Sequence, residues 1–168
     1  MIFVTVGTHE QPFNRLIKKI DELKRDGIIK EDVLMQIGFS TYIPQYCKYK
    51  KLIPYQDMVK NVENARIVIT HGGPSSFIMP LQVGKIPVVV PRQEKFNEHV
   101  NNHQLVFAND VNERYHNLIV VENIDDLDNI INSYDEIINN IDASMSNHNQ
   151  EFCKKFDVIA NELVGEEK

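Results

Sequence analysis

Tryptophan is absent from this sequence of 168 residues, cysteine occurs only twice, and there is no long apolar run. The two cysteines, Cys47 and Cys153, are too far apart for metal-ligand spacing, so we expect reduced thiols in a cytosolic protein. No segment approaches the roughly 20 apolar residues that cross a bilayer. The opening residues also lack the basic and apolar regions of a signal peptide. A disulfide scaffold and an integral membrane protein are therefore not expected.

An excess of basic residues is absent as well, because 18 lysines and arginines stand against 24 aspartates and glutamates. The net charge of −6 argues against general binding to nucleic acids, so no nucleic-acid partner is expected. The chain does contain an ordinary globular share of hydrophobic residues, 42%. That share supports a real hydrophobic core in a single domain of this length.

Short apolar segments alternate along the chain with longer segments of helical spacing. Strands are predicted at residues 2–6, 33–37, 49–53, 66–70, 87–90 and 118–121. Helices are predicted at residues 12–24, 58–65, about 76–83, 98–108, 124–141 and 143–164. This alternation predicts an α/β fold: a single Rossmann-like domain over residues 1–164, with a parallel sheet covered by helices on both faces. Residues 165–168 are expected to be a frayed tail.

Two strand ends carry loops of unusual composition, Gly7-Thr8-His9-Glu10 and His71-Gly72-Gly73-Pro74-Ser75-Ser76. Ligands of a parallel α/β sheet bind outside the carboxyl ends of its strands. Glycines let the backbone turn sharply and approach a ligand, and the two serines are suited to cap the following helix. The free N–H groups and the dipole of that helix favour a phosphate or diphosphate, to which His71 can donate a hydrogen bond. The alternative is a tight strand-to-helix turn that binds nothing.

A third polar loop follows the strand predicted at residues 87–90. Asn102, His103 and Gln104 offer both donors and acceptors, which suits the discrimination of sugar hydroxyls. The alternative is a solvated helix face. His99 and His103 also have the one-turn spacing of metal ligands. Because no carboxylate or further histidine stands in a fixed relation to them, no metal site is predicted.

Three segments carry a family resemblance: MIFVTVGTHEQPFNRLI at the start, HGGPSSFIMPLQVGKIPVVVPR in the middle and EHVNNHQ after it. In this order they resemble the C-terminal, nucleotide-sugar-binding half of GT-B glycosyltransferases, the glycosyltransferase family 28 C-terminal domain. Within that family they resemble most the soluble subunits of two-chain bacterial enzymes of capsule and exopolysaccharide synthesis. The resemblance is strong over about residues 1–110 and weak over the last two helices. The combination of motifs is specific, although no single motif is.

The resemblance implies a UDP-sugar as the donor substrate, with no further cofactor and no metal. The residues with implied roles are Gly7, Thr8, His71, Gly72, Gly73, Pro74, Ser75 and Ser76 for the diphosphate, Tyr55 to Met58 for the uracil, and Asn102, His103 and Gln104 for the donor sugar. One position departs from the family pattern, because Met79 stands where a glutamate contacts the ribose. Neither the family nor the residues decide between galactose and N-acetylglucosamine as the sugar.

A GT-B enzyme has two Rossmann-like halves with the active site between them, and this chain has room for one. The resemblance therefore implies a membrane-anchored partner that binds a lipid-linked saccharide acceptor, with this chain held at the cytoplasmic face of the plasma membrane. Inversion at the sugar needs a general base. The loop at residues 71–76 and the start of the following helix would stabilise the leaving diphosphate. His9 is the one candidate base in this chain, with a phosphate or interface contact as its alternative role. We expect no transfer by the chain alone.

Two other functions remain as alternatives. The first is a non-catalytic binding module that enhances a partner glycosyltransferase without holding the donor, and a nucleotide titration separates it from a donor-binding subunit. The second is an NAD-type oxidoreductase domain. It is disfavoured because no G-x-G-x-x-G follows the first strand and no acidic residue follows at the required distance.

Overall fold

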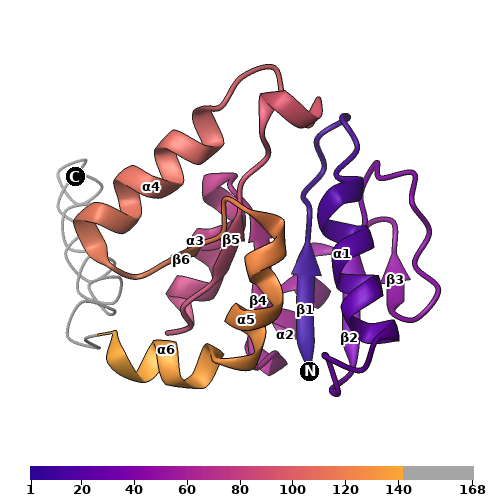
Figure 1. The fold of residues 1–168 in the computed structure, drawn as a ribbon, viewed down its shortest axis with the longest axis horizontal. Coiled ribbons are helices and arrows are strands. Elements are labelled where there is room, and N and C mark those ends of the chain that lie inside the picture. The colour runs from indigo at the N-terminus through magenta and orange to yellow at the C-terminus, as the bar shows by residue number, and fades with distance from the viewer. Residues whose placement is uncertain (142–168) are drawn as a thin grey trace, which may run out of the picture.

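The computed structural model describes residues 1–141, which form one six-stranded sheet in which all neighbouring strands are parallel (Figure 1). The strands are β1 (Ile2–Thr5), β2 (Val33–Gln36), β3 (Lys48–Lys50), β4 (Ile67–His71), β5 (Val88–Val90) and β6 (Ile119–Val120). The α-helices are α1 (Asn14–Arg25), α2 (Tyr55–Asn64), α3 (Pro74–Gln82), α4 (His103–Tyr115), α5 (Leu127–Asn132) and α6 (Tyr134–Asn140). Two short 3-10 turns are η1 (Glu94–Phe96) and η2 (Ile124–Asp126).

Strand residues alternate between the two faces of the sheet, as the side-chain period of two requires. Ile2 and Val4 of β1 join the core under α1, α5 and α6, whereas Phe3 joins the cluster under α2. On that second face, Phe77 of α3 and Ala108 of α4 form the next cluster. Both faces of the sheet are therefore covered by helices, which is why the strands are apolar on both sides. Figure 1 shows α1 and α5 in front of the sheet and α2 behind it.

The strand order β3-β2-β1-β4-β5-β6 reverses between β1 and β4. These two strands pair directly, although two other strands lie between them in the sequence. In open α/β sheets the crevice outside the carboxyl ends of the strands, at such a reversal, is where ligands bind. The fold confirms the predicted Rossmann-like architecture. It also brings together the two glycine-bearing loops, because they follow β1 and β4.

The helix predicted at residues 98–108 is wrong at both ends, because α4 begins only at His103 and continues to Tyr115. Before it, the chain forms just the single turn η1. Asn97 ends that turn in a left-handed conformation with a φ of 55°, and residues 98–102 form no helix. The carboxylate of Glu98 accepts the backbone N–H of Gln93 at 3.1 Å. The segment thus forms a closed loop held by its own polar groups.

The continuous helix predicted at residues 124–141 is also wrong, because η2, α5 and α6 form there with a break at Ser133. Tyr134, the residue after the break, is buried, and its hydroxyl donates to the carbonyl of Ile86 at 2.7 Å. The third strand is shifted as well. β3 covers residues 48–50 and is exposed, while Ile53 joins the core under α2.

The helix predicted at residues 143–164, the tail at 165–168 and Cys153 lie outside the described residues. Cys47 is free and buried. Burial is the main reason that the pKa of its thiol is raised to about 12, so this thiol is unreactive at neutral pH. Within residues 1–141, no helix has both the length and the apolar character that crossing a bilayer requires.

Candidate functional site

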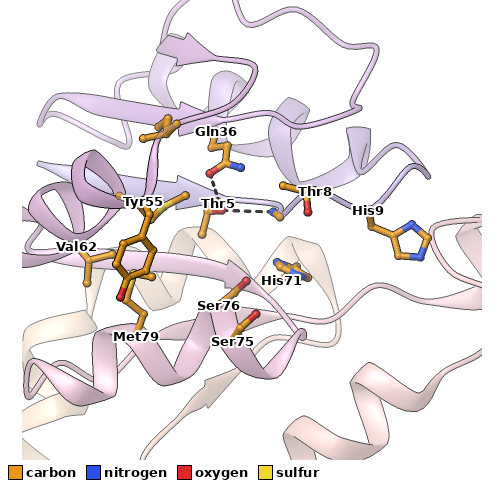
Figure 2. Close-up of a pocket in the computed structure, with 13 residues that line it drawn as sticks. Thr5, Thr8, His9, Gln36, Tyr55, Val62, His71, Ser75, Ser76 and Met79 are labelled. Carbon is orange, nitrogen blue, oxygen red and sulfur yellow. Dashed lines mark hydrogen bonds between the residues drawn. The ribbon is translucent and has the colours of Figure 1, made fainter.

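A cavity of about 600 Å³ opens at the carboxyl ends of β1, β2 and β4 (Figure 2). Its walls come from the loop after β1, the end of β2, helix α2, and the first turns of α3. The lining residues are Thr5, Gly7, Thr8, His9, Gln36, Ile53, Tyr55, Met58, Val62, His71, Ser75, Ser76 and Met79. The cavity therefore lies at the reversal of strand order, between the two glycine-bearing loops.

The cavity has an apolar end and a polar end, as Figure 2 shows. Tyr55, Val62 and Met79 lie at the apolar end, on α2 and α3. At the polar end, the two serines of the first turn of α3 lie near His71, across from Thr8. Ligand sites in proteins commonly combine apolar walls with a few placed polar groups. This division suits a ligand with a flat apolar part and an anionic part.

His71 is the last residue of β4, and its imidazole lies between two glycines. A Cβ at Gly7 would come within 2.5 Å of the ring atom Cε1, and a Cβ at Gly73 within 2.4 Å of Nε2. Gly7 also has a φ of +72°, which other residues rarely adopt. These two glycines therefore make room for the histidine ring, a role that the sequence pattern alone does not reveal.

The imidazole of His71 is neutral at physiological pH. Only 8% of the residue is exposed. This burial, assisted by the positive charge of Arg92, lowers the pKa of His71 to about 4. Its Nδ1 has no hydrogen-bond partner among the described residues. A neutral imidazole can donate one hydrogen bond to an anion but cannot contribute a full positive charge.

Helix α3 begins at Pro74, with Gly73 at the N-cap position and no side chain capping the first turn. The prediction that Ser75 or Ser76 caps the helix is therefore wrong, and both lie within its first turn. Proline is favourable at the first helical position, because an N–H there would have no partner inside the helix. The positive end of the helix dipole lies at the cavity with the two serines. Pro80 lies inside the helix, close to its end at Gln82.

The loop after β5 is built around a buried arginine. Arg92 is 1% exposed, and its guanidinium donates to the carbonyls of Val6, Gln11 and Glu98 at 3.0, 2.8 and 3.2 Å. The ring of Phe13 lies 4.7 Å from the guanidinium carbon. Burial lowers the pKa of Arg92 to about 10, so it remains charged at neutral pH. Arg92 thereby joins the loop after β1 to the loop after β5.

A second charged pair holds the same two loops. The carboxylate of Glu98, 3% exposed, forms a two-pronged ion pair with Arg15 on α1, with both contacts at 2.8 Å. Arg15 also donates to the carbonyl of Pro91 at 3.0 Å. Charge-assisted pairs of this geometry are among the stronger hydrogen bonds in proteins. Sequence reasoning missed this network because its partners are mostly backbone carbonyls far apart in the chain.

The residues predicted to contact the sugar, Asn102, His103 and Gln104, do not belong to the cavity lining. Gln104 is 5% exposed and accepts the backbone N–H of Arg92 at 3.3 Å. It packs against Gly72, where an added Cβ would come within 2.8 Å of its own Cβ. Asn102 and His103 are exposed. The predicted contact of these three residues with a sugar stays a prediction.

A row of histidines runs from the cavity to the start of α4. The ring of His99 lies edge to face with those of His9 and His103, at centroid distances of 4.8 and 4.4 Å. Burial first, and then the charges of His103 and His9, lower the pKa of His99. Among residues 1–141, no group of three or more histidines, cysteines or acidic residues is arranged to hold a metal ion. Through His99, the row connects His103 to His9, which lines the cavity.

The structure brings together most of the residues predicted around a nucleotide. Those that line the cavity are Gly7, Thr8, Tyr55, Met58, His71, Ser75 and Ser76, together with His9. Of the other three, Gly72 and Gly73 form the turn between β4 and α3, and Pro74 is the first residue of α3. Sequence reasoning missed Thr5 and Gln36, whose side chains hydrogen bond to each other at 3.4 Å. Their polar character at the ends of two apolar strands is a signal that could have found them.

Comparisons with known proteins identify the family of the chain. The model of the glycosyltransferase family 28 C-terminal domain matches residues 1–163. The UDP-N-acetylglucosamine transferase subunit ALG13 of Homo sapiens is 32% identical over 124 residues, which are 68% of this chain and 10% of that protein. The corresponding protein of Mus musculus is 29% identical over 123 residues, with the same shares. The chain thus spans about a tenth of the length of these curated relatives.

Among solved structures, the crystal structure of the glycotransferase of kitacinnamycin superposes with a TM-score of 0.52 at 16% sequence identity. The match covers 79% of this chain and 34% of that one. At this identity the likeness concerns the fold alone, and it agrees with the parallel sheet described above.

Proposed function

The chain belongs to the family of the glycosyltransferase family 28 C-terminal domain, and from this premise we propose that it is the donor-binding subunit of a glycosyltransferase. The proposed donor is a UDP-sugar and the proposed reaction inverts the anomeric centre. The proposed acceptor is a lipid-linked saccharide in capsule or exopolysaccharide synthesis. The observation that carries the proposal is the cavity at the β1–β4 reversal, where a neutral, tightly seated histidine meets the uncapped start of α3.

The polar end of the cavity suits a diphosphate. The first turn of α3 offers backbone N–H groups and the positive end of its dipole, and its two serine hydroxyls, Thr8 and neutral His71 can each donate a hydrogen bond. No lysine or arginine belongs to the cavity lining in the described part of the chain. In our proposal, fixed dipoles therefore stabilise the charge that develops on the leaving diphosphate.

The apolar end of the cavity suits the nucleoside. The ring of Tyr55 is 73% exposed and, with Met58 beside it in the lining, offers a surface for the uracil base. Met79 cannot replace the family glutamate as an acceptor for the ribose hydroxyls. We assign that contact to Thr5 and Gln36, the polar pair on the sheet side of the cavity.

We propose that the reaction uses residues of two chains, this one and its partner. The acceptor hydroxyl attacks the anomeric carbon, the bond from that carbon to the β-phosphate oxygen breaks, and UDP leaves with the electron pair. The hydroxyl proton passes to a base. Nδ1 of His9 accepts the backbone N–H of Gln11 at 3.2 Å, so the neutral ring carries its proton on Nε2. Because that nitrogen is then a donor, we assign His9 to a phosphate contact and the base to the partner.

The rest of the active site is proposed to come from a membrane-anchored partner. One Rossmann-like unit can hold a donor, but positioning an acceptor against it supplies a large part of the rate enhancement. The human relative is named as a transferase subunit, which supports a divided enzyme. In this chain, the exposed Asn102 and His103 would meet the sugar at the rim, while Gln104 supports the loop from behind. Galactose and N-acetylglucosamine are both candidates for that sugar.

Calorimetric titration of the chain with UDP, UMP and ADP tests the donor site. We expect UDP to bind most tightly, because UMP lacks the second phosphate and ADP carries a larger base. The decisive variant is Ser76→Asp, which places a carboxylate where the diphosphate would lie. An acidic residue in the first turn favours the helix, so loss of UDP binding would report repulsion and not unfolding.

The matched control for this titration is Ser133→Asp, which adds the same charge at the start of α6, away from the cavity. It should bind UDP as the native chain does. An unchanged UDP affinity in Ser76→Asp would contradict the assignment of the site.

A transfer assay tests whether this chain supplies only the donor site and the partner supplies the acceptor site. The chain is incubated with UDP-galactose or UDP-N-acetylglucosamine and a lipid-linked or soluble acceptor, with and without the partner. We expect product only when the partner is present. Robust turnover by the single chain would overturn the divided enzyme. A native chain that stimulates its partner but binds no uridine nucleotide would favour the binding-module alternative.

A further inference from the structure

One exposed strip of the protein lies outside the cavity, along an edge of the sheet. β3 is the last strand of the sheet and pairs only with β2, and the loop that leads into it runs along the same side (Figure 1). The strip contains exposed apolar side chains and three exposed lysines. We call it the edge patch; its residues are Phe39, Ile43, Tyr46, Tyr49, Leu52, Lys48, Lys50 and Lys51.

The edge patch is basic within an acidic protein. From residue 33 to residue 56 there is no aspartate or glutamate, whereas the whole chain has a net charge of −6. Lys48 lies 3.9 Å from the carboxylate of Asp32. Neither Lys50 nor Lys51 forms an ion pair with another described residue. The Lys51 ammonium lies 5.4 Å from the centroid of the Phe39 ring, so these two residues place a positive charge beside an aromatic ring.

The edge patch is also held in place from beneath. The buried carboxylate of Asp21 accepts the Tyr42 hydroxyl at 2.9 Å and the backbone N–H groups of Gln45, Tyr46 and Cys47 at 2.8, 2.8 and 3.0 Å. Burial alone would raise the pKa of this carboxyl, but the hydrogen bonds outweigh it and lower the pKa. The negative charge is thus directed inward, and the loop presents its apolar side chains in a fixed arrangement.

We propose that the edge patch docks this chain on an anionic lipid bilayer. Lysines are attracted to the anionic head groups, and tyrosine and leucine side chains enter the interfacial layer of the membrane. The strength of such attachment increases with the apolar area buried in the interface and with the electrostatic attraction to anionic lipids. A large exposed apolar patch with charged residues is a sign of an interaction surface, and the sign of this charge fits anionic lipid.

Two other occupants fit the edge patch less well. Protein–protein interfaces are enriched in arginine and depleted in lysine, and this patch has three lysines and no arginine. A second copy of the chain, paired through β3, would bring lysines together along an edge that lysines protect from such pairing. An anionic membrane surface is therefore the occupant that the composition favours.

Docking would also orient the cavity. Ile53 and Tyr55, which follow the edge patch directly in the chain, line the cavity. The cavity mouth would then lie near the bilayer surface, where a lipid-linked acceptor is found. This consequence rests on the proposed function, whereas the docking itself does not.

Co-sedimentation of the full chain with vesicles tests the proposal without any activity assay. Vesicles of phosphatidylcholine with phosphatidylglycerol are compared with vesicles of phosphatidylcholine alone. We expect binding to the first kind only, weakened by salt. The variant Lys50→Gln/Lys51→Gln should lower the partition coefficient about fivefold for each lysine, about 25-fold in all. Lys30→Gln/Lys60→Gln removes the same charge from exposed positions outside the patch and should bind as the native chain does.

A second variant separates apolar insertion from simple charge attraction. Tyr46→Ser/Leu52→Ser keeps every charge and should still lower vesicle binding. Equal losses in the patch and control lysine pairs, equal binding to both kinds of vesicle, or no binding to either would overturn the proposal. Loss of partner binding in the patch variants, without any vesicle binding by the native chain, would show that the patch is a protein interface.

Discussion

The loops after β1, β4 and β5 follow three neighbouring strands at the same end of the sheet. The polar residues of the first two loops line a cavity, whereas those of the third bond to other protein groups. At the first two, Nδ1 of His71 has no partner among the described residues and the serines of α3 cap nothing. At the third, Arg92, Glu98 and Gln104 are buried and bonded to protein groups. A polar loop at a strand end is therefore not a ligand site by itself. The cavity lies between the first two loops, whereas the hydrogen bonds of the third loop hold its walls.

The reason for this difference lies in the order of the strands. β1 and β4 flank the reversal of strand order, so their loops diverge and leave a crevice between them. β5 lies one strand further along, where the loop after β1 reaches across to it. Arg92 fills that junction and donates to carbonyls of both loops. The third loop thus supports the site that the other two form.

The largest effect that we expect is on the supporting loop. Arg92→Met removes a buried guanidinium and leaves several carbonyls without a donor, so the free energy of unfolding should fall by about 3–5 kcal/mol. Urea unfolding measures it. Arg114→Met, at an exposed position of α4, is the control and should cost less than about 0.5 kcal/mol. A cost below about 1 kcal/mol for Arg92→Met would refute the structural role of the arginine.

The next effect concerns His71 and pH. Its pKa is about 4 in the folded chain against an ordinary 6.5, so the folded state takes up the proton less readily than the unfolded state. The free energy of unfolding should be unaffected by this group above about pH 6.5 and should fall by about 3 kcal/mol as the pH drops to about 4.

Urea unfolding of the native chain and of His71→Gln across this pH range measures the contribution of the histidine. The variant should lose this part of the pH dependence, while His116→Gln, at an exposed position, should keep it. Identical pH profiles for the native chain and His71→Gln would show that the imidazole titrates normally.

A smaller effect tests whether Gly73 makes room for the His71 ring. Gly73→Ala should push on the His71 ring and weaken UDP binding about tenfold, which is the loss of about one hydrogen bond. Calorimetry of a double-mutant cycle with His71→Ala gives the mechanism. If the alanine acts through the ring, it should cost little in the His71→Ala background. An equal cost in both backgrounds would mean that Gly73 itself approaches the ligand.

The smallest effect shows whether Gln104 supports the loop after β5 or contacts the donor sugar. Gln104→Ala should weaken UDP and UDP-sugar equally, by about 1 kcal/mol or about fivefold, because Gln104 holds the loop through the N–H of Arg92. The two affinities are measured side by side by calorimetry. A greater loss for the UDP-sugar than for UDP would instead support the sugar contact predicted from the sequence.

Much of the fold could be predicted because its signals are local. Apolar runs predicted the strands, and the alternation with helices predicted a parallel sheet, which the structure confirms. The errors arose where distant residues decide local structure. The helix before His103 fails because Glu98 bonds to Gln93 and Arg15. The single helix predicted at residues 124–141 breaks at Ser133, and Tyr134, the residue after the break, hydrogen bonds to the distant Ile86.

The sequence by itself determined the family, the class of fold and the two segments that come to line the cavity, since glycines and serines at strand ends can be recognised without a structure. Only the tertiary structure decided what each residue does there. Gly7 and Gly73 are 66 positions apart, yet both contact the His71 ring. Gln104 faces inward and His71 is neutral. Contacts and burial depend on which strands become neighbours, and that neighbourhood is a property of the folded sheet.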